Sequence, residues 1–197
     1  MNNLAFALAA TIKHDGQGGI ADLLSTPQEA GAWFRDHEEL VARVVGRRLA
    51  VPDSPADLWP ELVRIRRAVR ALFGRAVAPG PPSKADADRL MDADAALKLV
   101  NRAADRLGGE RLEWPADGEP VVRRVARTED PVALVTGAVG RSAIDFLAGP
   151  DRVRLRACPA ARCVKYFLQD DPRQTWCSPA CGNRERVNRH YRRRTAG

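Results

Sequence analysis

Four cysteines near the C-terminal end place the strongest constraint on how this chain can fold. All the cysteines of the 197-residue sequence occur in one short stretch, with the spacing Cys158-x4-Cys163-x13-Cys177-x3-Cys181. Two close pairs are typical of a structural zinc site, because each pair can form one edge of a tetrahedron while the segment between them folds back. The alternative is two disulfides. The sequence shows no secretory signal and cytosolic thiols stay reduced, which favours zinc.

The residues around these cysteines predict a small finger-like unit. Val164 to Leu168 favours a strand, Gln169 to Pro172 a turn, and Arg173 to Trp176 a second strand that returns to the third cysteine. Ser178-Pro179 suits the N-cap and first position of a helix, with Cys181 in its first turn. A knuckle, a hairpin and a helix make a treble-clef arrangement. We expect one structural zinc ion per chain, held by Cys158, Cys163, Cys177 and Cys181.

The net charge of the chain is concentrated in this unit. The sequence has a formal charge of +7, and residues 151–197 carry 12 Lys and Arg against 4 Asp and Glu, so the first 150 residues are close to neutral. Wound as a helix, residues 179–194 place Val187 and Tyr191 on one side, where we expect them to pack against Phe167 or Trp176. The other side is rich in arginine. Such a face is typical of nucleic-acid binding, although a merely solvated cationic helix would show the same pattern.

The predicted nucleic-acid contacts therefore lie on this helix, with Arg186, Arg189 and Arg193 at the centre of the exposed face. Arg184 lies on the inner side near the cysteines, where a structural role and a ligand contact are both open. The full predicted set is Asn183, Arg184, Arg186, Arg189, His190, Arg192, Arg193 and Arg194. DNA is the expected partner. RNA or a protein is the alternative, with the finger as a structural clasp.

The first 150 residues predict a mainly helical domain with one small hairpin. With 45% of its residues hydrophobic, the chain can bury a core. Thr26-Pro27 and Ser54-Pro55 are typical helix starts, and an apolar stripe at helical spacing follows the second start. That stripe consists of Leu58, Leu62, Ile65, Val69 and Leu72. We expect the basic residues beside it to form a solvated face, with a nucleic-acid surface as the alternative; they are Arg64, Arg66, Arg67 and Arg70.

Three further elements complete the predicted body. Ser83 and Asp86 resemble a capping box, from which a helix would run to Leu107. Segments 111–114 and 120–126 flank an Asp-Gly turn and predict a β-hairpin. A last helix opens at Asp130-Pro131 and ends before Gly149.

Catalytic, membrane and secretory signals are weak in this sequence. It contains three histidines, and the patterns HExxH and GxSxG do not occur. We therefore predict that the protein is not an enzyme; the alternative is a small-molecule binder or enzyme with a pocket lined by Trp33, Trp59 or Trp114. The apolar run from Leu4 to Ile12 is too short to span a membrane and lacks a positively charged start. We expect a cytoplasmic protein without membrane association.

The run Cys181-Gly182-Asn183-Arg184, with Trp176-Cys177-Ser178 before it, resembles the CGNR zinc finger, which is named for these four residues. In bacterial proteins of this family the finger follows an α-rich domain called ABATE. Stretches 22–33, 62–73, 97–101 and 141–143 resemble that domain. The resemblance implies an ABATE domain over residues 1–150, a CGNR zinc finger over residues 151–197 with the four cysteines as ligands, and a role in stress-induced transcription regulation.

These observations predict a mainly α protein that regulates transcription by binding DNA. The finger would contact DNA, and the helical body would sense a signal or mediate self-association. A single finger offers a limited contact area, which is compatible with a homodimer formed through the body, although no motif specifies one.

Overall fold

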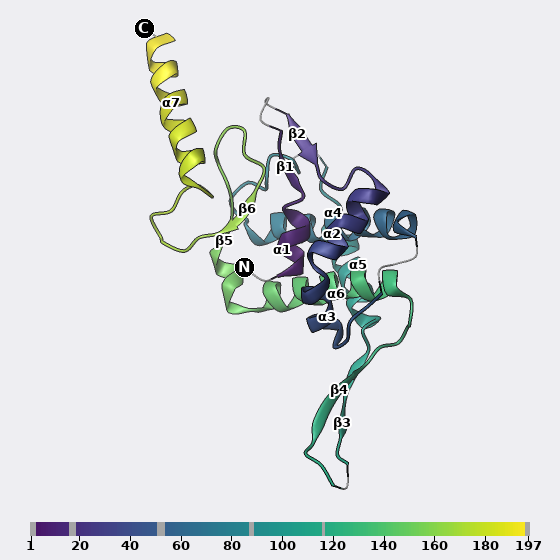
Figure 1. The fold of residues 1–197 in the computed structure, drawn as a ribbon. Coiled ribbons are helices and arrows are strands. Elements are labelled where there is room, and N and C mark those ends of the chain that lie inside the picture. Colours follow the sequence, from purple (N-terminus) through teal and green to yellow (C-terminus); the bar gives the residue numbers. More distant parts are fainter. Residues whose placement is uncertain (1–2, 16–18, 51–53, 87–88, 116, 196–197) are drawn as a thin grey trace.

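Two long helices, α4 (Pro55–Ala76) and α6 (Pro131–Ala148), form the centre of the protein. The structure is a computed structural model that describes residues 3–15, 19–50, 54–86, 89–115 and 117–195; the side chains of His190, Arg192, Arg193 and Thr195 lie outside this description. Figure 1 shows how the remaining helices are arranged relative to this centre, with the last helix projecting away from it. They are α1 (Leu4–Ala9), α2 (Pro27–Asp36), α3 (Glu38–Val45), α5 (Ala93–Asp105), the 3-10 helix η1 (Pro150–Arg154) and α7 (Pro179–Thr195).

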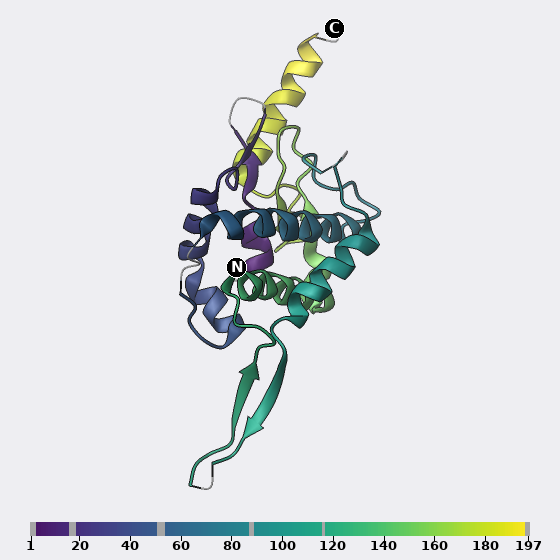
Figure 2. The same ribbon diagram turned by 90° about the vertical axis from the view of Figure 1, so that its right-hand side faces the viewer.

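The described strands form three separate antiparallel pairs. β1 (Ile12–His14) pairs with β2 (Ile20–Asp22), β3 (Gly109–Glu113) with β4 (Val121–Val125), and β5 (Leu155–Ala157) with β6 (Tyr166–Leu168). The β3–β4 hairpin confirms the strand pair expected around the Asp-Gly turn. It projects from one end of the molecule, and α7 projects from the opposite end (Figures 1 and 2).

The helix starts of the body follow the expected capping chemistry. Thr26 and Glu29 form a capping box at the start of α2, and the Asp130 side chain accepts a hydrogen bond from the Val132 amide at the start of α6. All five apolar residues of the predicted α4 stripe are buried. The core therefore forms where the sequence pattern placed it.

Helix α6 is long and apolar enough to cross a membrane, but it lies in the protein core. It contacts α1, α3, α4 and α5, and 61% of it is buried inside the protein. Its glycines allow a close approach to α5, because a Cβ on Gly140 would lie 2.9 Å from the Val100 carbonyl oxygen. Burial against four helices explains its apolar composition.

Aromatic rings join the body to the strands that precede the cysteines. The Phe73 ring centroid lies 4.8 Å from that of Phe6, 5.6 Å from that of Phe146 and 5.5 Å from that of Tyr166 of β6. Leu155 of β5 is also part of this core. The finger is thus packed on the body rather than tethered by a free linker.

Two expectations about the α4 arginines were wrong. Arg66 and Arg70 are buried, with 4% of each side chain exposed, whereas Arg64 and Arg67 are exposed as expected. The buried guanidinium groups are stable there because carboxylates and carbonyl oxygens satisfy them. Their partners are the side chains of Asp22, Asp86, Thr11 and Ser83 and the carbonyls of Ala9 and Val164.

The predicted capping box at Ser83 was also wrong. Helix α5 begins at Ala93, and the Asp92 side chain caps it by accepting from the Ala95 amide. Ser83 and Asp86 instead form a turn in which the Asp86 amide donates to the Ser83 carbonyl, and both side chains are buried. Their polar groups are used by Arg70 and by the finger.

The hairpin of the finger differs from the prediction. β6 pairs with β5, which precedes the first cysteine, rather than with residues 173–176. The register joins Leu155 to Leu168 and Ala157 to Tyr166. In this pairing Leu155 and Tyr166 are both buried in the core that they share with the body.

Candidate metal centre and basic helix

The four cysteine sulfur atoms form one cluster, all within 4.8 Å of one another. Cys158 follows β5, Cys163 lies in the next turn, Cys177 ends the loop after β6 and Cys181 lies in the first turn of α7. The Sγ of Cys177 lies 3.6 Å from that of Cys163 and 3.7 Å from that of Cys181. Residues distant in sequence thus meet at one point.

These distances suit a metal ion and exclude disulfides. A tetrahedral ion with bonds of about 2.3 Å to sulfur sets its ligands about 3.8 Å apart. A disulfide requires about 2.05 Å, and all four cysteines are free. The residues present therefore fit a metal ion, and the disulfide alternative is wrong.

The electrostatics of the cluster also favour a cation. Hydrogen bonds with Cys163 and Cys177 lower the pKa of the Cys158 thiol to about 2. The hydrogen bond with Cys158 in turn raises the pKa of Cys163 to about 11. Hydrogen bonds with Cys158 and Cys163 also raise the pKa of Cys177. Thiolates this close repel one another, so only a bound cation would allow all four to be charged.

Helix α7 and the body both hold the turn between the first two cysteines. The amide of Ala161 donates to the Glu185 carboxylate over 2.6 Å, and the ammonium of Lys84 donates to the carbonyl oxygens of Pro159 and Ala160 over 2.8 and 2.6 Å. Cys181 donates its amide to the Ser178 hydroxyl at the helix start. The sulfur positions are therefore fixed by groups from three segments.

A buried polar cluster connects the body to the residue that follows Cys163. The Val164 carbonyl accepts hydrogen bonds from the Ser83 hydroxyl over 2.8 Å and from Arg70 over 3.3 Å. The Tyr166 hydroxyl donates to Asp86 over 3.0 Å, and burial raises the pKa of this phenol. Sequence analysis missed this role of Arg70. The available signal was its position as the single charge in the apolar run from Ala68 to Gly74.

The described part of the predicted nucleic-acid set lies on one projecting helix. Asn183, Arg186, Arg189 and Arg194 are exposed, whereas Arg184 is half-buried near the cysteines. Arg186 donates to the Asn183 side chain over 2.7 Å. The predicted contacts through His190, Arg192 and Arg193 lie outside the described side chains.

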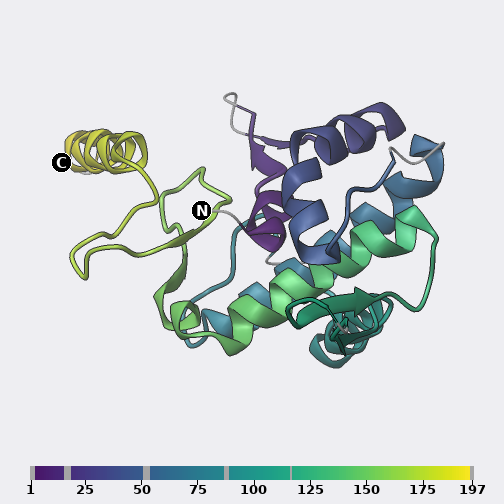
Figure 3. The same ribbon diagram turned by 60° about the horizontal axis from the view of Figure 1, so that its bottom comes forward.

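The expected inward packing of Val187 and Tyr191 was wrong, because both side chains are more than half exposed. Figure 1 shows the reason, since the outer turns of α7 project away from the other described elements, and in Figure 3, which views α7 nearly end-on, the helical body lies to one side of it. The first half of α7 is partly covered: Glu185 accepts from the Ala161 amide, and the Trp176 ring lies against Gly182 so closely that a Cβ there would be 3.1 Å from the ring. Gly182 therefore has a packing role, because its lack of a side chain leaves room for the Trp176 ring.

The tryptophans of the body do not line a common pocket. Trp33 is buried and stacks on His37, Trp59 donates its indole N–H to the Leu24 carbonyl over 2.7 Å, and Trp114 is exposed beyond β3. Trp33 borders a shallow hollow of about 310 Å³. Two of the three rings thus serve packing within the helical body.

Comparison with known families matches both parts of the chain. The ABATE family model, described as "Putative stress-induced transcription regulator", matches residues 2–150, and the CGNR zinc finger model matches residues 154–194. Neither is an enzyme family. No curated protein matches the chain. The two matches follow one another in the order that the sequence resemblance implied.

Proposed function

Because the chain belongs to the ABATE family and ends in a CGNR zinc finger, we propose that it is a transcription regulator that binds DNA through α7. In this proposal residues 151–197 form the DNA-binding unit and residues 1–150 the sensor or self-association unit. Action in the cytoplasm of a bacterium belongs to the same proposal, as does a link to stress, and the family description supports the link to stress.

The observation that carries this proposal is the exposure of α7. The helix presents Arg186, Arg189 and Arg194 to solvent and projects from the rest of the molecule (Figures 1 and 2). An α-helix fits the major groove of DNA, and arginine suits both phosphates and guanine edges. A projecting helix can enter a groove without a clash from the helical body.

We propose one zinc ion per chain, with Cys158, Cys163, Cys177 and Cys181 as its ligands. The free thiols and their tetrahedral spacing support this assignment. When bound, zinc would supply a fixed joint between β5, the loop after β6 and the start of α7. Four thiolates and one Zn²⁺ add a charge of about −2, so the unit stays cationic overall.

A role in protein contact has one specific observation in its favour. On the β3–β4 hairpin, Leu112 and Val122 face each other across the strands and are both exposed, as is Trp114 beyond β3. Self-association of the body through this hairpin would give a regulator with two fingers.

RNA binding, by contrast, would be indicated by a preference of the protein for RNA over duplex DNA.

The test is charge reversal on α7. We expect Arg186→Glu/Arg189→Glu to weaken binding to duplex DNA by at least about tenfold in fluorescence anisotropy, because two phosphate or base contacts become repulsive. The matched control is Arg102→Glu/Arg106→Glu, which changes the net charge equally on exposed residues of the α5 end. Equal loss in both variants would mean that only net charge matters and would refute the assigned face.

A further inference from the structure

A hollow of about 600 Å³ opens between the β1–β2 pair, α4 and the segment before α5. This volume lies within the usual range for small-molecule sites. The lining residues that matter to the argument are Ile20, Arg66, Arg67, Asp86, Arg89 and Leu90.

The charges on the wall divide into a paired and an unpaired set. Arg66 is neutralised by Asp22, with hydrogen bonds of 2.5 and 2.6 Å, and Arg70 by Asp86 at 2.8 Å. Arg67 and Arg89 also line the hollow, are exposed, and form no ion pair within the described residues. Two guanidinium groups without an ion-pair partner among the described residues favour an anionic ligand at this hollow.

The rim of the same hollow is apolar. Ile20 and Leu90 are large hydrophobic side chains with 51% and 40% of their surfaces exposed. Contact with the hydrocarbon part of a ligand would cover this apolar surface. A free inorganic anion could use the arginines but not these side chains.

We propose that this hollow binds a small organic anion, with Arg67 and Arg89 contacting its acidic group and Ile20 and Leu90 its apolar part. The site is suited to the sensor role of the body. Its wall residues Arg70 and Asp86 also hold Val164 and Tyr166, next to the cysteine cluster. The effector role rests on the proposed function, whereas ligand binding itself does not.

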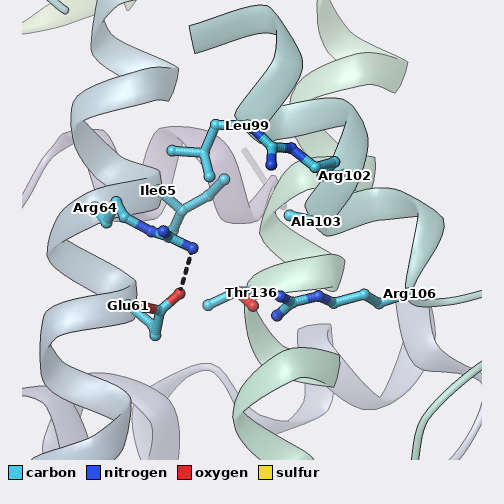
Figure 4. A pocket seen from close by; sticks show the side chains of 8 residues that line it. All are labelled: Glu61, Arg64, Ile65, Leu99, Arg102, Ala103, Arg106 and Thr136. Atoms are coloured by element: carbon cyan, nitrogen blue, oxygen red, sulfur yellow. Dashed lines mark hydrogen bonds and ion pairs between the residues drawn. The ribbon is translucent and has the colours of Figure 1, made fainter. Parts of the chain in front are cut away.

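A second cationic hollow provides the comparison. Arg64, Arg102 and Arg106 surround it, and Glu61 pairs with Arg64 over 2.9 Å (Figure 4). Its volume is about 90 Å³, which suits a phosphate-sized ion but is too small for an aromatic acid. It therefore offers arginines of similar exposure without room for the proposed ligand.

The experiment uses the full chain and the fluorescent aromatic sulfonate 1-anilinonaphthalene-8-sulfonate. We expect saturable binding that Arg67→Ala/Arg89→Ala weakens by about tenfold or more, while Arg102→Ala/Arg106→Ala leaves it unchanged. 2-Naphthoate should displace the probe at concentrations at which inorganic phosphate does not.

Three results would overturn the proposal: no saturable binding, equal weakening in the two variants, or displacement by phosphate as effective as by 2-naphthoate. The mutated side chains are exposed, so circular dichroism should show unchanged folding. DNA binding does not enter this measurement. A protein that does not bind DNA can still bind the fluorescent probe as expected, and a protein that binds DNA can fail to bind the probe.

Discussion

The Arg70 guanidinium donates a hydrogen bond of 2.8 Å to the Asp86 carboxylate, and both side chains are almost fully removed from solvent. The same two residues contact Val164 and Tyr166. This ion pair therefore stands between the core of the helical body and the polypeptide next to the cysteine cluster. Its geometry makes the two parts of the chain one packed structure.

Removing one partner of this pair should be costly. We expect Asp86→Ala to lower the free energy of unfolding by about 3–5 kcal/mol, because it leaves the Arg70 charge buried and uncompensated. The double variant Arg70→Met/Asp86→Ala should lose clearly less than the sum of the two single variants. Urea unfolding of wild type, Asp86→Ala, Arg70→Met and the double variant measures this coupling. Additive losses of unfolding free energy would show that the pair does not interact.

Removal of metal should unfold only part of the finger. Because Leu155 and Tyr166 belong to the body core, we expect β5 and β6 to keep their protection after chelation, while the amides of α7 lose theirs. Hydrogen exchange with and without a chelator measures this pattern, and metal analysis of the untreated protein should give one zinc per chain. Unchanged protection of α7 after complete metal loss would contradict the zinc assignment.

The contact between α5 and α6 should depend on glycine. A Cβ at position 140 would lie 2.9 Å from the Val100 carbonyl oxygen, so Gly140→Ala forces backbone to move. We expect a loss of about 1–3 kcal/mol in the free energy of unfolding. Gly31→Ala is the control, since its nearest neighbour would be the Arg35 side chain at 3.4 Å. That variant should be neutral or slightly stabilised by its higher helix propensity, and an equal loss in both would contradict the close helix contact.

The ion pair between Asp22 and Arg66 predicts a pH dependence. Burial opposes ionisation of Asp22, but hydrogen bonds from Arg66 and from the Leu24 amide lower its pKa below the ordinary value of 3.8. A carboxylate with a lowered pKa in the folded state stabilises the protein above the unfolded-state pKa and loses this effect as pH falls through the folded-state pKa.

We therefore expect the thermal midpoint of wild type to exceed that of Asp22→Asn by a constant amount between about pH 7 and pH 5, and the difference to narrow below about pH 4. Asp117→Asn, which alters an exposed turn residue, should show no such trend. A difference that stays constant down to the lowest pH at which both proteins fold would rule out the proposed ionisation.

Local sequence chemistry predicted several elements but not α1, the β1–β2 pair or the contacts between distant segments. The Thr26 cap, the α4 stripe and the Asp-Gly hairpin depend on neighbouring residues, and all three were predicted correctly. The pairing of β6 with β5 and the burial of Arg70 depend on what the body places beside them. Helical spacing alone cannot show that Ser83 and Asp86 turn toward Arg70 rather than cap a helix.

In the candidate site, too, the local pattern was predicted correctly and the packing between segments was not. The clustering of the four cysteines was predictable because their spacing is typical of metal ligands. The inward packing predicted for Val187 and Tyr191 was wrong because a periodic pattern identifies the faces of a helix but not whether anything lies against them. Here both side chains lie on a projecting helix and stay more than half exposed.

The most direct test of the account is the salt dependence of DNA binding by the metal-loaded full chain. If α7 neutralises about five phosphates, the logarithm of the affinity for duplex DNA should fall with the logarithm of the salt concentration with a slope of about −4.5. Arg186→Glu/Arg189→Glu should make the slope shallower. Absence of binding to duplex DNA at low salt, or a slope that this variant does not change, would contradict the claim that α7 is the DNA-binding surface.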